Sequence, residues 1–115
     1  MIGHNSRTID PDRIAAELER LGMEWADKHA AACLLEGTEK SVLAEAAADH
    51  RAHCKSQAEA ESRARYDRKF TDHVKAMVEA RREANRARVR FEAFKAKVEL
   101  LRTNAATDRA LMSLR

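Results

Sequence analysis

The sequence predicts an all-α protein in which two short helices and one long basic helix pack as a helical hairpin or coiled-coil bundle. Ala, Glu, Arg, Lys and Leu dominate the 115 residues, and this composition is typical of long helices. Three Gly and one Pro are too few for the turns that a β-sandwich or barrel needs. Apolar residues recur at spacings of three and four, which is the period of an amphipathic helix.

The first helix is expected over residues 11–36, after a flexible arm over residues 1–9. Asp10 can accept hydrogen bonds from the free N–H groups of the first turn, and Pro11 suits the first helical position. Gly37 is expected to end this helix in the left-handed conformation. The spacing predicts one inner face, formed by Ile14, Leu18, Leu21, Trp25, His29 and Ala32.

Two further helices are expected, over residues 39–54 and 57–113. Thr38 can cap the first of them, and Ser56 with Glu59 fits a capping box at the start of the second. The alternative at Ser56 is a continuous helix with an exposed serine. The inner face of the helix over 39–54 is expected to consist of Val42, Leu43, Ala46, Ala47 and His50. Residues 10–115 are expected to form a single helical domain.

The long helix has a heptad pattern that predicts a coiled-coil seam. With Phe70 as position a, the a and d positions are apolar from Met77 to Leu101. The main seam residues are Phe70, Met77, Ala84, Phe91, Phe94, Val98 and Leu101. A lone helix cannot bury this seam, and the core of so small a chain is modest. We therefore expect the other two helices, a second copy of the chain, or both to cover it, and a homo-oligomer to form.

Charge is distributed unevenly along the chain. Residues 1–62 contain seven Lys or Arg and twelve Asp or Glu, a net charge of −5. Residues 63–115 contain fifteen Lys or Arg and seven Asp or Glu, a net charge of +8. The heptad places a cation at position e five times in succession, at Arg81, Arg88, Lys95, Arg102 and Arg109, and Arg90 and Lys97 lie at position g.

This basic stripe predicts one of three partners. The acidic half of the chain can neutralise it, within one chain or across an oligomer, because e and g charges commonly select partners in coiled coils. Nucleic acid is the second candidate, since a cationic rod matches a phosphate backbone. An acidic protein is the third. Sequence-specific base reading is not expected, because Phe91 and Phe94 belong to the seam.

The sequence contains no pattern that indicates an enzyme. No Ser-His-Asp grouping, Gly-rich phosphate loop or HExxH motif is present. His29 with Cys33, and His50 with Cys54, each place two zinc-type ligands four residues apart. A hairpin around Gly37 would hold the two pairs too far apart to share one zinc ion, so we expect no metal. Because no catalytic or phosphate-binding motif is present, we also expect no other cofactor and no small-molecule substrate.

The sequence also predicts a cytoplasmic protein without a membrane partner. No apolar run approaches the roughly 18–20 residues needed to span a bilayer. The first residues contain no apolar stretch of signal-peptide length. Cys33 and Cys54 are therefore expected to be free thiols.

The chain resembles small helical proteins encoded in prophages of alphaproteobacteria. The start Met-Ile-Gly-His-Asn-Ser carries this resemblance, together with the segments 34–36, 40–44, 56–61 and 77–81, Tyr66, and Arg109-Ala110. Genes of this type often accompany phage recombination and replication functions, such as single-strand annealing proteins. The resemblance implies an accessory role on DNA or on a DNA-handling protein.

We therefore expect a phage-derived accessory protein that binds DNA non-specifically or docks on a recombination protein. Two alternatives stay open. The chain can be a protein-binding module, such as a phage inhibitor of a host defence or host enzyme, or a purely structural coiled-coil oligomer.

Overall fold

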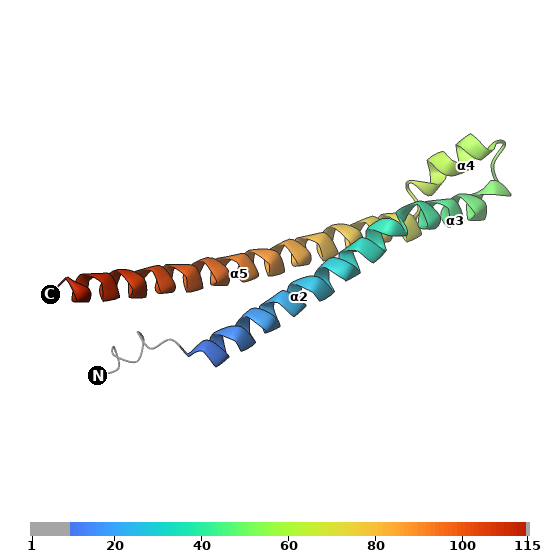
Figure 1. The fold of residues 1–115 in the computed structure, drawn as a ribbon. Coiled ribbons are helices and arrows are strands. Elements are labelled where there is room, and N and C mark those ends of the chain that lie inside the picture. The colour runs from blue at the N-terminus through green and yellow to red at the C-terminus, as the bar shows by residue number, and fades with distance from the viewer. Residues whose placement is uncertain (1–9, 115) are drawn as a thin grey trace. The chain divides into compact units, whose positions relative to one another are not determined.

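The computed structural model describes residues 10–114, and they form four helices and no strand (Figure 1). The flexible arm expected over residues 1–9 lies outside the described residues. The helices are α2 (Pro11–Gly37), α3 (Glu39–Arg51), α4 (Gln57–Ala64) and α5 (Arg68–Ser113). The predicted all-α fold class with a long C-terminal helix is confirmed.

Helix α2 begins where the sequence predicts, because Asp10 caps it. One oxygen of the Asp10 carboxylate accepts the backbone N–H of Asp12 at 3.0 Å and that of Arg13 at 3.4 Å. These bonds satisfy two of the donors that the first turn of a helix leaves free.

The end of α2 differs from the prediction. Gly37 does not have a positive φ, and Thr38 makes no side-chain cap for α3. Instead the Thr38 hydroxyl donates back to the Leu34 carbonyl at 3.0 Å. Helical hydrogen bonds continue on both sides of the junction, from Thr38 N–H to the Leu34 carbonyl and from Val42 N–H to the Thr38 carbonyl. The chain therefore does not reverse at Gly37, and α3 runs on from α2 (Figure 1).

The chain reverses after α3, which ends at Arg51 and not at residue 54. Helix α4 lies beside α3 (Figure 1). Ser56 caps α4 as predicted, because its hydroxyl accepts the Glu59 N–H at 3.2 Å. The Glu59 carboxylate reaches back to the N–H of Lys55 at 3.0 Å, one residue earlier than a capping box requires.

The helix expected over residues 57–113 is interrupted at residues 65–67, so α4 and α5 are separate. The N–H groups of Tyr66 and Asp67 bond to carbonyls three residues back, at Arg63 and Ala64, which tightens the end of α4. The Asp67 carboxylate then accepts the Lys69 N–H at 2.8 Å. Asp67 is thus the cap that starts a new helix without any Gly or Pro.

Contacts within the chain divide it into two compact units. One unit comprises residues 26–85, and the other comprises the chain up to Trp25 together with the chain from Arg86 onward. The extent of the domain expected over residues 10–115 stays a prediction.

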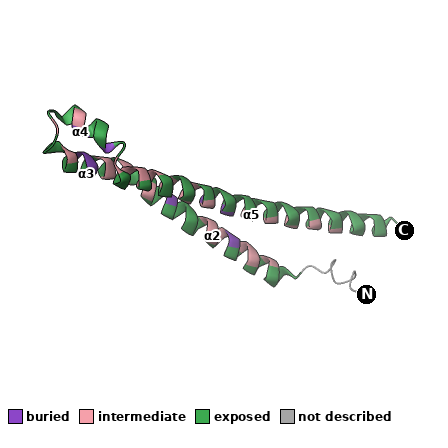
Figure 2. Cartoon of the chain, turned by 180° about the vertical axis from the view of Figure 1, so that it is seen from behind, coloured by how far each residue is buried: buried purple, intermediate pink, exposed green. Residues whose placement is uncertain are grey.

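Most of the buried side chains are small. In the described chain, the buried hydrophobic residues are alanines and Leu21 (Figure 2). In the unit of residues 26–85, Ala46, Ala47 and Ala64 pack together, with the partly buried Leu43 against them. Because alanine projects only a methyl group, helices α3 and α4 can approach closely while burying little apolar surface.

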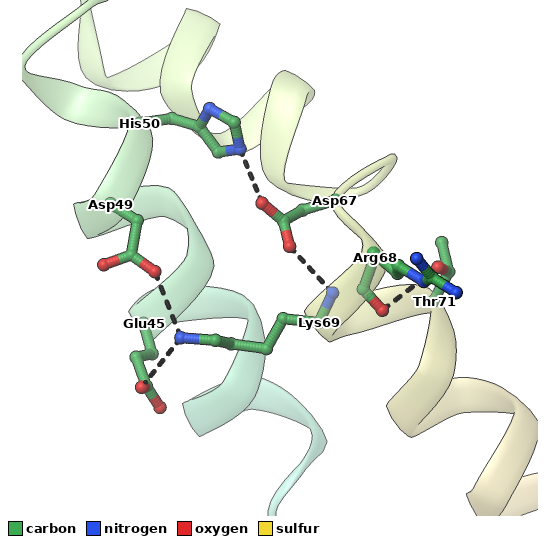
Figure 3. A network of polar contacts seen from close by, with 7 residues as sticks. All are labelled: Glu45, Asp49, His50, Asp67, Arg68, Lys69 and Thr71. Atoms are coloured by element: carbon green, nitrogen blue, oxygen red, sulfur yellow. Dashed lines mark hydrogen bonds and ion pairs between the residues drawn. The ribbon is translucent and has the colours of Figure 1, made fainter.

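A polar network beside this alanine cluster ties α3 to the start of α5 (Figure 3). The Lys69 ammonium lies 3.1 Å from both the Glu45 and the Asp49 carboxylates, and these hydrogen bonds raise its pKa. His50 Nε2 lies 2.8 Å from the Asp67 carboxylate. The backbone N–H of Lys69 and the His50 ring hold the pKa of Asp67 below its ordinary value.

Candidate functional site

The predicted seam forms the least exposed face of α5. Ala84 and Ala87 are buried, and the other a and d residues from Phe70 to Leu101 are half-buried. The polar d residue His73 donates from Nε2 to the Leu35 carbonyl at 2.7 Å. Among residues 102–114 only Ala105 stays half-buried, and Met112 is 71% exposed. Whether a second copy of the chain also packs on this seam stays a prediction.

The first cation of the basic stripe is held within the unit of residues 26–85. The Arg81 guanidinium forms a two-point pair with the Glu36 carboxylate, at 2.8 Å from Nε and 2.6 Å from a terminal nitrogen. The arginine lowers the pKa of Glu36, and the carboxylate raises the pKa of Arg81. Two-point arginine–carboxylate pairs are the stronger kind of ion pair, so Arg81 is not an open binding group.

His29 and Cys33 complete the surroundings of Arg81. A guanidinium only donates, so His29 Nδ1, at 3.1 Å from Arg81, is the acceptor. This assignment leaves the ring proton on Nε2, which lies 3.4 Å from Cys33 Sγ. A second Arg81 nitrogen lies 3.8 Å from the same sulfur. Among residues 10–114, no group of three or more His, Cys, Asp or Glu side chains could hold a metal ion.

The other cations of the stripe belong to the second unit. Arg90 pairs with the Glu24 carboxylate of α2 at 2.7 Å. No ion pair with another described residue is found for the remaining five, which are all exposed. These are Arg88, Lys95, Lys97, Arg102 and Arg109.

Four of these five lie along one side of α5, at every seventh position. Because an α-helix rises about 1.5 Å per residue, successive cations of this row are about 10.5 Å apart. Arg102 and Arg109 border one open cavity of about 420 Å³, whose other lining residues are Thr103, Ala105 and Ala106. We call Arg88, Lys95, Arg102 and Arg109 the open stripe.

An apolar groove lies next to the open stripe in the same unit. It has a volume of about 310 Å³, and its lining combines the first turns of α2 with the seam side of α5. The lining residues are Pro11, Ile14, Ala15, Leu18, Val98 and Arg102. The groove shows that α2 does not fill the seam completely here.

The sequence placed the cations on the helix correctly but could not tell which of them are paired. The partners of Arg81 and Arg90 are 45 and 66 residues away along the chain. Local spacing holds no signal for such distant pairs.

Comparisons with models of protein families, with curated proteins and with solved structures found no match to this chain. Within residues 10–114, no helix is both long and apolar enough to cross a membrane.

Proposed function

We propose that this chain is a phage-derived accessory protein of DNA recombination or replication, which holds DNA non-specifically through the open stripe of α5. One observation supports this most directly. Arg81 and Arg90 are paired with carboxylates of α2, whereas the four cations of the open stripe are exposed and have no such partner among the described residues.

The chemistry of the open stripe suits phosphate. Three of its four residues are arginines, whose planar guanidinium can bond two phosphate oxygens at once. Binding of each phosphate releases condensed counterions, and this release provides most of the free energy of non-specific DNA binding. Phe91 and Phe94 are half-buried on the seam face, so stacking on bases is not part of the proposal.

The proposal is tested by the salt dependence of binding to a duplex of random sequence. Four phosphate contacts should give a slope of about −3.6 for log affinity against log salt, since each contact contributes about −0.9. Replacing both Arg88 and Lys95 by Gln should weaken binding and bring the slope to about −1.8.

Arg81 provides the matched control for this experiment. Arg81→Gln removes one cation, as Arg88→Gln does, but the Arg81 guanidinium is already engaged by Glu36. We expect Arg88→Gln to change the slope by about one contact and Arg81→Gln to leave it unchanged. Failure of the unmodified protein to bind DNA at 50 mM salt would contradict the proposal.

A second candidate function has its own supporting observation. No side chain larger than that of Leu21 is buried in the described chain, so the single chain buries little apolar surface. This favours the alternative of a protein-binding module or a structural coiled-coil oligomer, in which a partner covers the remaining surface. An acidic protein then takes the place of DNA on the open stripe.

A further inference from the structure

The outward face of α5 contains a second pattern, made of uncharged residues at positions c and f of the heptad counted from Phe70. From Val89 onward, uncharged residues recur at alternating spacings of four and three. They are Val89, Ala93, Ala96, Leu100, Thr103, Thr107, Ala110 and Leu114, and all eight are exposed. We call this set the second seam.

The second seam points away from the first. Successive residues of an α-helix are turned by about 100°, so Leu100 is turned by about 200° from Val98 of the first seam. The first seam faces α2, as the contact between Phe91 and Trp25 shows. Within residues 10–114 no segment covers the second seam, since Val89 is 57%, Leu100 60% and Leu114 83% exposed.

A row of uncharged residues is not expected on a helix face that only contacts water. The face of a surface helix that points to water normally contains charged residues. Charged residues make up 36% of the chain. None of the eight positions of the second seam, which extend over 26 residues, is charged. Six of the eight residues are apolar, and mainly apolar positions at this spacing over three to four heptads indicate packing against another helix.

The charges beside the second seam indicate what that other helix is. Glu92 and Glu99 lie on one side of the second seam, and Arg90 and Lys97 lie on the other. If a second copy packs in parallel and in register, the acidic side of each helix faces the basic side of the other. Glu92 then lies opposite Lys97 of the second copy, five positions further on.

An antiparallel pair would bring equal sides together, with basic residues facing basic ones. The charged side chains that would pair in the parallel arrangement are exposed in the single chain. Glu92 and Lys97 are both exposed, and neither forms an ion pair with another residue of the segment 10–114. Arg90 can keep its pair with Glu24.

We propose that the second seam is the interface with a second copy of this chain, and that the two α5 helices pack there in parallel and in register. This proposal does not rest on DNA binding. It also differs from oligomerisation through the first seam, because a different face of α5 forms the contact. Lys95 lies about 100° from Ala96 around the helix, so the open stripe stays accessible in the pair.

Sedimentation equilibrium of the full chain tests the interface. The unmodified protein should sediment with at least twice the single-chain mass of 13.0 kDa at micromolar concentration. Leu100→Glu should sediment as a monomer with unchanged helix content by circular dichroism. The matched control Lys95→Glu also places Glu on an exposed part of α5, outside both seams, and should stay dimeric. A monomeric unmodified protein, or a dimeric Leu100→Glu, overturns the proposal.

Charge reversal tests the orientation. Glu92→Lys and Lys97→Glu should each weaken the dimer by about three- to tenfold, because each reversal places like charges at two symmetry-related contacts. The double variant restores opposite charges in a parallel pair and should recover the affinity of the unmodified protein. Additive weakening in the double variant overturns the parallel arrangement.

Cross-linking provides a second test of orientation, in a background where Cys33 and Cys54 are replaced by Ser. Leu100→Cys should form a disulfide-linked dimer under mild oxidation, since equivalent seam residues meet in a parallel in-register pair. Lys95→Cys, on the same helix but outside the seam, should stay monomeric on a non-reducing gel. Equal cross-linking of both variants, or of neither, overturns the proposal.

Discussion

The rings of Trp25 and Phe91 pack with their centroids 5.6 Å apart and their planes tilted by 39°. This pair joins α2 to α5 in the unit that also contains the open stripe. Gly22 lies almost one turn before Trp25, and a Cβ at this position would lie 3.4 Å from the edge of the Phe91 ring. At that distance an added methyl group would make ordinary van der Waals contact with the ring, so this packing alone does not require a glycine at position 22.

Removal of the Phe91 ring tests this packing. Phe91→Ala should lower the free energy of unfolding by about 2 kcal/mol, less than the roughly 3–5 kcal/mol of a fully buried ring, because Phe91 is half-buried. Urea denaturation followed by circular dichroism measures the change. Lys95→Ala, on an exposed part of the same helix, is the control, and a loss below about 0.5 kcal/mol for Phe91→Ala would contradict the ring contact.

Gly37→Ala is expected to stabilise the protein. The residue does not have a positive φ, and nothing lies within 4 Å of the position of an added Cβ. Alanine should therefore raise the free energy of unfolding by about 0.5–1 kcal/mol through its higher helix propensity. A destabilised variant in thermal unfolding would instead indicate the left-handed conformation that the sequence alone suggested.

Ser56→Ala is expected to destabilise α4. The Ser56 hydroxyl accepts the Glu59 N–H at the start of this helix, and the loss of such a cap costs about 1 kcal/mol. Ser56→Asp keeps an acceptor at the same place and should retain most of the stability. If the alanine and aspartate variants unfold alike, the capping role of Ser56 is wrong.

Acid should weaken the contact of Asp67 with His50. The pKa of Asp67 is lowered in the folded chain, so the unfolded chain binds a proton more readily at this group. Its contribution to stability is present above its ordinary pKa of 3.8 and is lost as the pH falls through the lower folded value.

Asp67→Asn isolates this effect, because asparagine keeps an oxygen that can accept the Lys69 N–H while it removes the charge. The stability difference between the unmodified protein and Asp67→Asn should be constant well above pH 4 and shrink at lower pH. A difference that does not depend on pH would show that the charge of Asp67 contributes nothing.

Local sequence signals predicted the features of this fold that depend on neighbouring residues. Asp10 and Ser56 cap helices where expected, because a cap uses a side chain and N–H groups only two or three residues away. The heptad from Phe70 identified the inner face of α5, since burial follows helical period.

Features that depend on contacts between residues distant along the chain could not be predicted from the sequence. At the break before α5, Asp67 contacts His50 of α3 and Lys69 contacts Glu45 of α3, and both partners are distant along the chain. The pairing of Arg81 with Glu36 decides which cations stay open, and spacing along one helix cannot reveal it. The second seam is visible as a spacing in the sequence, but only the structure shows that no other described segment packs on this face.

The separation of contacts along the chain has a consequence for the order of folding. The bonds from Asp67 and Lys69 to α3 close segments of only 17 to 24 residues, whereas Arg90 and Glu24 are separated by 66. Loop-closure entropy favours the shorter segments first. Once Arg81 and Glu36 have met, much of the long loop between Trp25 and Phe91 is already closed. We therefore expect the ring contact to form at a reduced entropic cost, after the middle of the chain has folded.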